Sequence, residues 1–196
     1  MSSELIFHKR QLRQKLRALL KTMCAAPNPA DSLRACDLLR QQSVWKNARS
    51  VLFYTPLPGE LDLTSLHFEA VAQGKIIALP RFIEARGEYD AFQIHNAAQD
   101  CVPGKFGIRE PAAHCASLPL MHLDLIMTPG VGFDLTGHRL GRGQGYYDRL
   151  LARAKGVKCG VAFDQQIMEH IPGETHDVPM NCILTPTRWL EVCRST

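Results

Sequence analysis

Short apolar runs of five to seven residues alternate with stretches of helical periodicity along this chain, and this alternation is what most restricts its fold. The clearest run, LDLIMTP at 123–129, predicts a buried strand because it is almost uninterrupted by polar residues. Further strands are predicted at 50–54, 75–80, 89–94, 157–163 and 181–186, and helices at 4–24, 31–42, 63–73 and 146–155. Strands separated by helices are typical of an α/β fold with a largely parallel central sheet flanked by helices.

We expect a single domain over residues 1–196. A chain of 196 residues is long enough to bury a sizeable core, and no segment has the composition of a linker. The hydrophobic share of 45% and the charged share of 21% are ordinary for a globular protein and exclude a wholly disordered one. The stretch from about 96 to 119 is rich in proline, glycine and alanine and is predicted to be a loop.

Membrane and secretory features are missing from the sequence. No apolar run reaches the roughly 20 residues of a membrane helix, and the N-terminal MSSELIFHKRQLRQKLRALLK interleaves its charges with apolar residues, unlike a signal peptide. The seven cysteines are odd in number and form no CxxC motif, which argues against a disulfide framework or a zinc site. We therefore expect a cytoplasmic protein, and because nothing demands an oligomer, a monomer.

The segment RLGRGQGYYDRLL at 139–151 places three alternating glycines among basic residues just before a predicted helix. Glycine lets backbone N–H groups converge on an anion, and Arg139 and Arg142 would add charges whose geometry matches phosphate. The segment is neither a Walker A loop nor a dinucleotide fingerprint, because no G-K-[ST] follows and the spacing is not GxGxxG. It therefore predicts a polyphosphate cradle, with a strained connection as the alternative.

Two aspartates are candidate ligands of a metal ion beside such a phosphate. Asp148 falls in the first turn of the helix predicted after the glycines, and Asp177 stands in the loop sequence GETHDVP. Mg²⁺ is commonly bound through one or two carboxylates together with phosphate oxygens. The alternatives are that Asp148 only complements the helix dipole and that Asp177 is a turn residue.

The longer segment PGVGFDLTGHRLGRGQGYYDRLL closely resembles the signature of 5-formyltetrahydrofolate cyclo-ligases, also called 5,10-methenyltetrahydrofolate synthetases. Weaker landmarks of that family follow in the same order along nearly the whole chain: KRQLR at 9–13, YTPLPGELD at 54–62, KFGIREP at 105–111, LDLIMTPG at 123–130 and THDVP at 175–179.

The resemblance implies an ATP- and Mg²⁺-dependent ligase that converts 5-formyltetrahydrofolate to 5,10-methenyltetrahydrofolate, ADP and phosphate. In that reaction the formyl oxygen is phosphorylated, N10 closes the ring, and phosphate leaves. Such chemistry needs positioning and charge neutralisation more than a protein nucleophile. The sequence agrees in offering basic groups, glycines and acids and in lacking a nucleophile motif such as GxSxG.

The resemblance also implies roles for particular residues. Binding of ATP is expected at Lys9, Arg10, Arg13, Arg139, Leu140, Gly141, Arg142, Gly143, Gln144, Gly145, Tyr146 and Tyr147. Binding of the folate is expected at Thr55, Glu60, Arg142, Gly143, Gln144, Gly145 and Tyr146. Arg142 and Tyr146 are the expected catalytic residues, and Asp148 and Asp177 the expected Mg²⁺ ligands. Arg17 is expected to be a surface residue.

Other interpretations of these residues stay open. The basic residues at 9–17 could form a solvated helix face, and one of Tyr146 and Tyr147 is expected to pack on the core, with Tyr146 nearer the ligand. A related enzyme of the same fold could act on a different formyl or acyl compound. A nucleotide- or RNA-binding module is disfavoured because no RNP-type aromatic motif and no long basic run is present, so no nucleic-acid partner is expected.

Overall fold

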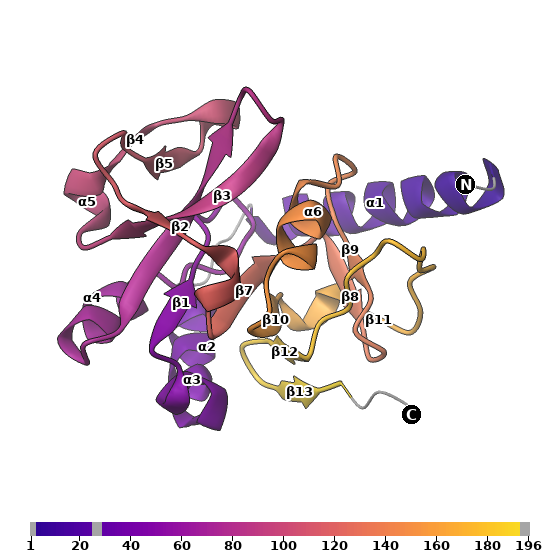
Figure 1. The fold of residues 1–196 in the computed structure, drawn as a ribbon. Coiled ribbons are helices and arrows are strands. Elements are labelled where there is room, and N and C mark those ends of the chain that lie inside the picture. Colours follow the sequence, from indigo (N-terminus) through magenta and orange to yellow (C-terminus); the bar gives the residue numbers. More distant parts are fainter. Residues whose placement is uncertain (1–2, 25–28, 193–196) are drawn as a thin grey trace.

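An eight-stranded sheet organises the molecule (Figure 1), in a computed structural model that describes residues 3–24 and 29–192. The strand order is β13-β12-β10-β7-β1-β2-β3-β6. The bounds of these strands in chain order are β1 Ser50–Leu52, β2 Ile76–Ile83, β3 Glu88–Ile94, β6 Ser117–Leu118, β7 Leu125–Pro129, β10 Val157–Val161, β12 Cys182–Leu184 and β13 Trp189–Glu191.

The middle of this sheet is parallel and its two margins are antiparallel. Strands β12, β10, β7, β1 and β2 run in the same direction, with Val51 paired to Leu125 on one side and to Ile77 on the other. At the margins β3 pairs antiparallel with β2 and with β6, and β13 pairs antiparallel with β12. The predicted α/β fold with a largely parallel central sheet is therefore confirmed.

Side chains of the central strand β7 alternate between two hydrophobic cores, one on each face of the sheet. Leu125 and Met127 pack into the core that α2 (Pro29–Gln41), α3 (Ser43–Asn47) and α4 (Ser65–Ala72) cover. Ile126 packs into the core on the opposite face, with leucines of α6 (Tyr146–Ala152). Because both faces are covered, the strand is apolar throughout, which explains why its sequence gave the clearest signal.

A second, three-stranded sheet in the order β11-β8-β9 carries the long first helix. The bounds are α1 Ser3–Cys24, β8 Gly132–Asp134, β9 Arg139–Leu140 and β11 Ile167–Met168. Leu16 of α1 is buried there with Val131, Leu140 and Ile171, and Figure 1 shows α1 lying along this sheet, away from α2 to α4. This packing gives α1 one buried side and leaves the other to solvent.

The loop predicted from about 96 to 119 is wrong in part, because four regular elements lie in it. They are α5 (Ala97–Asp100), the β4–β5 ribbon (Cys101–Pro103 and Arg109–Pro111) and β6, with the 3-10 turn Lys105–Gly107 between the ribbon strands. These strands have two or three residues, too few to show periodicity, and β6 is fixed by its pairing with β3. Two more 3-10 turns lie at Leu120–His122 and Asp164–Gln166.

Several predicted elements are present but end earlier than expected. The strand predicted at 50–54 ends at Leu52, and the helix predicted at 146–155 ends at Ala152. The strands predicted at 157–163 and 181–186 are confined to β10 and β12. Apolar residues beyond these ends are still buried, as Phe53, Tyr54 and Ala154 are. An apolar sequence therefore predicted buried residues correctly but placed the ends of these strands and of the helix too late.

The cysteines were predicted not to form a disulfide framework. The five cysteines whose side chains are described are all free and buried, as expected of core residues.

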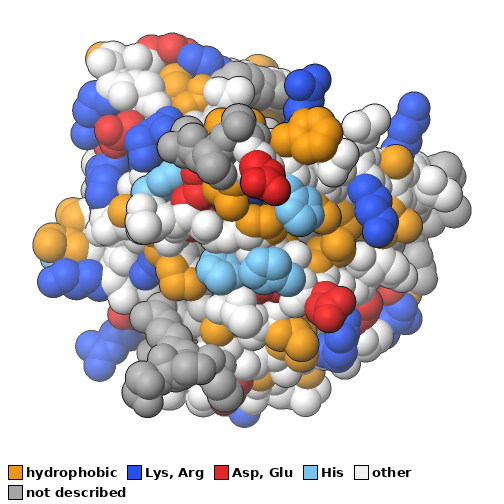
Figure 2. Space-filling view, turned by 90° about the vertical axis from the view of Figure 1, so that its right-hand side faces the viewer, with side chains coloured by type: hydrophobic (Ala, Val, Ile, Leu, Met, Phe, Trp, Pro, Cys, Tyr) orange, Lys and Arg blue, Asp and Glu red, His pale blue; other side chains and the backbone are white. Residues whose placement is uncertain are grey.

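Figure 2 shows the face at the right of Figure 1, where described lysines and arginines are scattered among histidine and hydrophobic side chains. Among residues 3–24 and 29–192, no helix combines the length and apolar character needed to span a membrane.

Candidate active site

A cavity of about 700 Å³ opens where the parallel strands β1 and β7 end. Thr55 follows β1, and Pro129 and Gly130 stand at the end of β7, so both carboxyl ends contribute to its wall. Crevices at the carboxyl ends of parallel strands are the usual ligand sites of open α/β sheets. Further lining residues come from α1, from the segment that runs from 139 to the start of α6, and from residues 174–177.

The predicted glycines form the loop between β9 and α6, which we call the glycine loop (residues 141–145). Gly143 has φ +104° and Gly145 has φ +65°, conformations that side-chain-bearing residues rarely adopt. Gly145 is also the residue that precedes the first turn of α6. The strand before the loop is β9, a two-residue strand of the small sheet.

Lys9 is the most deeply buried cation of the cavity, with 6% of its surface exposed. Its Nζ donates to Glu174 Oε2 at 2.9 Å and to Asp177 Oδ2 at 2.8 Å. Burial opposes the charge of Lys9, but the two carboxylates outweigh it and raise the pKa of the ammonium. Burial likewise opposes the charge of Asp177, and the bonds from Lys9 and from the Glu174 N–H lower its pKa overall.

A second ion pair joins Arg139 of β9 to Asp148 of α6, with Nη2 and Oδ1 2.7 Å apart. Arg139 is 8% exposed, and its Nε has no hydrogen-bond partner among the described residues. A buried N–H without a partner is costly unless a ligand or water satisfies it. The guanidinium also lies over the ring of Tyr147 at 5.6 Å. Arg139 is thus held by Asp148 while its buried Nε–H is left without a partner among the described residues.

A third ion pair spans the mouth of the cavity, from Arg142 Nη2 to Glu60 Oε1 at 2.7 Å. The Arg142 side chain is 52% exposed, whereas that of Glu60 is only 10% exposed. The other carboxylate oxygen of Glu60 accepts the backbone N–H of Leu57 at 3.0 Å. The turn after β1 therefore fixes Glu60, and Arg142 reaches it from the glycine loop.

Tyr146 and Tyr147 both line the cavity and both pack against the core beneath α6. Tyr146 makes edge contacts with Phe82 and Tyr89, at centroid distances of 5.2 and 5.7 Å. Burial raises the pKa of the Tyr147 phenol, which stays neutral. The sequence predicted that one tyrosine would pack on the core and that Tyr146 would lie nearer the ligand. In the structure each tyrosine both lines the cavity and packs against the core.

Comparisons with known proteins identify the family of this chain. Residues 6–186 match the model of the 5-formyltetrahydrofolate cyclo-ligase family. The chain belongs to this family. The mouse 5-formyltetrahydrofolate cyclo-ligase is 28% identical over 192 residues, covering 90% of this chain and 92% of the relative. The Escherichia coli K12 cyclo-ligase is 33% identical over 145 residues, covering 72% and 80%. The predictions of family and of a ligase are thus confirmed.

A solved relative extends the agreement to three dimensions. The solution structure of the Aquifex aeolicus 5,10-methenyltetrahydrofolate synthetase superposes with a TM-score of 0.81 at 34% identity, covering 96% of this chain and 94% of that one. The family fold therefore holds over nearly the entire chain, including the small sheet that carries α1.

In this cyclo-ligase family member, Arg10 is the one predicted site residue that the structure leaves outside the cavity. Arg10 is exposed, whereas its neighbours in the motif, Lys9 and Arg13, line the wall. Residues four apart share a helix face, and adjacent residues do not. Since α1 is packed through the face that carries Lys9 and Leu16, the side chain of Arg10 projects elsewhere.

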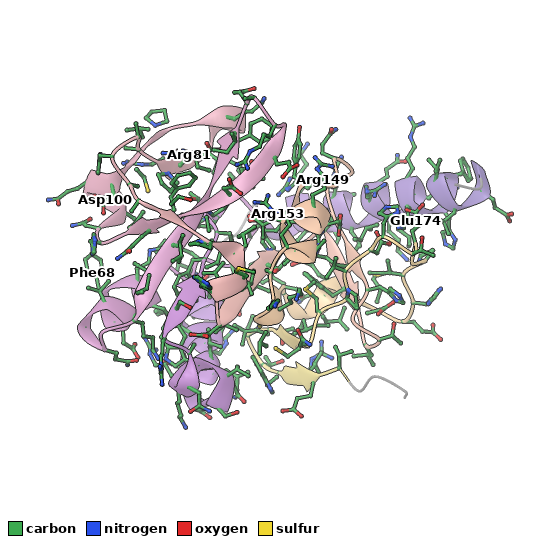
Figure 3. The ribbon with its side chains drawn as sticks, viewed as in Figure 1. Phe68, Arg81, Asp100, Arg149, Arg153 and Glu174 are labelled. Carbon is green, nitrogen blue, oxygen red and sulfur yellow. The ribbon has the colours of Figure 1, made fainter. Side chains whose placement is uncertain are left out.

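Glu174 and His176 line the cavity beside the predicted Asp177, although the sequence did not single them out. Glu174, His176 and Asp177 bring potential metal-ligating atoms within 4.8 Å of one another. Figure 3 shows Glu174 on the loop between β11 and β12, close to α1. Asp148 is not part of this group, because it pairs with Arg139 instead. The signal was present, since three potential ligands fall within four residues of GETHDVP.

Proposed function

We propose that this protein joins N10 of 5-formyltetrahydrofolate to its formyl carbon in an ATP- and Mg²⁺-dependent reaction, giving 5,10-methenyltetrahydrofolate, ADP and phosphate. Membership of the cyclo-ligase family supports the substrate. The observation that carries the proposal is that one cavity collects the cations, glycines and carboxylates that the reaction requires.

The phosphates of ATP would bind between the glycine loop and the face of α1 that lines the cavity. Lys9, Arg13 and Arg139 all border this space. The buried Nε–H of Arg139, which has no partner among the described residues, could donate a hydrogen bond to a phosphate oxygen. Guanidinium and ammonium groups in a partly enclosed site bind phosphate oxygens strongly because little water competes with them. ATP would thus take the place of carboxylates as the partner of Lys9 and Arg139.

The residues present also fit Mg²⁺. Asp148 and Asp177 both line the cavity, and carboxylate oxygens are the protein ligands that Mg²⁺ prefers. Glu174 stands beside Asp177 and shares its contact with Lys9. When bound, Mg²⁺ supplies positive charge that neutralises the phosphate oxygens during transfer. In the chain itself, Lys9 and Arg139 hold these carboxylates in place.

The folate would bind on the Glu60 side of the cavity. A carboxylate can accept two N–H bonds from the 2-amino-4-oxo edge of a pterin, and Glu60 is held by the Leu57 N–H in a largely enclosed position. Thr55 lies on the same wall, with its hydroxyl bonded to the backbone of Arg109 at 2.9 Å. Residues Arg142 to Tyr146 would then contact both the folate and the nucleotide and bring the two substrates together.

In the reaction the formyl oxygen attacks the γ-phosphorus, and the bond to the β,γ-bridging oxygen breaks to release ADP. The phosphorylated imidate is then attacked by N10, whose proton is lost, and the carbon–oxygen bond breaks to release phosphate. Arg142 stands at the junction of the two sites and would stabilise charge on the transferring group. Tyr146, braced by Phe82 and Tyr89, would position the folate.

The test is to incubate the protein with ATP, Mg²⁺ and 5-formyltetrahydrofolate and to follow the absorbance of the methenyl product. We expect product and ADP in equal amounts, and neither when ATP is omitted. Absence of product at high enzyme concentration would show the proposal to be wrong. Turnover of another formyl compound under the same conditions would favour a related enzyme with a different substrate.

A further inference from the structure

Three arginines donate hydrogen bonds to carbonyl oxygens of the glycine loop, Arg13 from the cavity wall and Arg17 and Arg149 from outside the cavity. Arg13 Nε donates to the Gly141 carbonyl at 2.9 Å, and Arg17 Nη2 donates to the Arg142 carbonyl at 3.2 Å. Arg149 Nη1 donates to the Gln144 carbonyl at 3.3 Å. The donors come from two helices, α1 and α6, so the loop is held at both ends.

The direction of these bonds matters for an anion site. In a trans peptide the carbonyl and the following N–H point in opposite directions. The N–H groups that follow the bonded carbonyls belong to Arg142, Gly143 and Gly145, and they therefore point away from the arginines. A loop whose carbonyls are engaged in this way offers N–H groups to phosphates and withdraws the oxygens that would repel them.

Arg149 links the loop to a third part of the molecule. Its Nη2 donates to the Gly87 carbonyl in the turn between β2 and β3 at 3.3 Å, and its guanidinium lies over the Tyr146 ring at 5.1 Å. Figure 3 shows Arg149 on α6 and Arg153 just after its end, on the side of β3. Arg153 instead pairs with Glu88 and Asp90. Arg149 therefore connects the turn between β2 and β3 to the glycine loop.

Neither Arg17 nor Arg149 lines the cavity, and both are exposed. They are thus placed to act on the loop without touching a substrate. With Gly143 and Gly145 in it, the free loop has many accessible conformations, and each external bond removes some of them. Holding a binding loop in its bound shape raises affinity by lowering the entropy lost on binding.

We propose that Arg17 and Arg149 are positioning residues that hold the glycine loop in its nucleotide-binding conformation and thereby set the affinity for ATP. This inference rests on the proposed function, because it takes the loop to be the phosphate site. It goes further because it assigns roles to Arg17, which was expected to be a surface residue, and to Arg149, which is also exposed.

The experiment compares Arg17→Met, Arg149→Met and the double variant with two matched controls. The controls are Lys15→Met on the exposed side of α1 and Arg153→Met just after the end of α6. ADP binding is measured by calorimetry, and amide hydrogen exchange is followed in the loop. We expect each single variant to weaken ADP binding about fivefold and the double variant more, as loss of one such hydrogen bond implies. Loop exchange should rise in parallel, and KM for ATP should rise more than kcat falls.

Lysine variants separate positioning from general stabilisation. Arg17→Lys keeps a donor for one carbonyl and should restore most of the ADP affinity. Arg149→Lys cannot hold both the Gln144 and the Gly87 carbonyls and should restore only part of it. ADP affinity and loop exchange equal to those of the controls, beside a wild type that binds ADP, would overturn the positioning roles alone. A wild type that bound no ADP would overturn the proposed function and this inference with it.

Discussion

Arg142 and Glu60 form an ion pair of 2.7 Å although 82 residues separate them in the sequence. The first is proposed to face the transferring phosphoryl group and the second to hold the pterin, so the two proposed subsites neutralise each other in the free protein. Lys9 with Asp177 and Arg139 with Asp148 repeat this arrangement deeper in the cavity. Ligands are thus expected to bind by exchanging partners with groups that are already oriented.

Replacing Glu60 by Gln should chiefly weaken folate binding. The amide cannot accept two N–H bonds from a pterin edge, and loss of one charge-assisted bond implies a rise in the KM for 5-formyltetrahydrofolate of about tenfold or more. The KM for ATP should change little. Glu84→Gln, at an exposed carboxylate paired with Lys105, is the matched control. Unchanged folate affinity in Glu60→Gln would show that the pterin role is wrong.

Replacing Arg142 by Ala should lower turnover more than binding. Loss of a single group that stabilises charge in the transition state typically lowers kcat by about a hundredfold. Steady-state kinetics with each substrate varied in turn would separate kcat from the two KM values. A variant with a raised KM and full kcat would assign Arg142 to ground-state binding and remove it from the catalytic residues.

The dependence on Mg²⁺ should shift in Asp148→Asn and Asp177→Asn. Each change removes a charged oxygen donor from the cavity, so more Mg²⁺ should be needed for half-maximal rate, by about tenfold. Asp37→Asn, at an exposed carboxylate on α2, should leave the requirement unchanged. If either site variant showed the wild-type Mg²⁺ dependence, that residue would not be a metal ligand. Chelation of Mg²⁺ in the wild type should abolish turnover.

Stability should rise with pH between about 4 and 6.5 because of His67. Its ring is buried against Phe53 at 4.5 Å, and burial lowers the pKa of the imidazole to about 4. The unfolded chain, with a histidine pKa of about 6.5, binds the proton more readily in this window, and the difference amounts to about 3 kcal/mol. Urea unfolding at several pH values should show this gain in the wild type. A His67→Phe variant with the same pH slope would contradict it.

The central sheet was predictable because its inner strands are buried on both faces. An unbroken apolar run such as LIMTP in β7 needs no knowledge of its partners to be recognised. The small sheet was missed, since β8, β9 and β11 have two or three residues and exist only through their pairing. That sheet matters for function, because it carries α1 and ends at the glycine loop.

The residues of the site likewise include some that the sequence predicted and others that it did not. The glycine loop suggested phosphate binding from its own chemistry, and the family resemblance pointed to Lys9, Arg13 and Glu60, which the structure brings to one cavity. Arg10 was included through its motif neighbours, although one helical step turns it away. Arg17 was expected to be only a surface residue, because nothing local reveals that a loop 125 residues later places a carbonyl beside it.

The path of the formyl oxygen tests the proposed mechanism most directly. The protein would be given ATP, Mg²⁺ and 5-formyltetrahydrofolate carrying oxygen-18 in the formyl group, and the released phosphate would be analysed by mass spectrometry. If the formyl oxygen attacks the γ-phosphorus in this cavity, each methenyl product should be matched by one phosphate that contains the label. Methenyl product accompanied by unlabelled phosphate would contradict phosphorylation of the formyl oxygen.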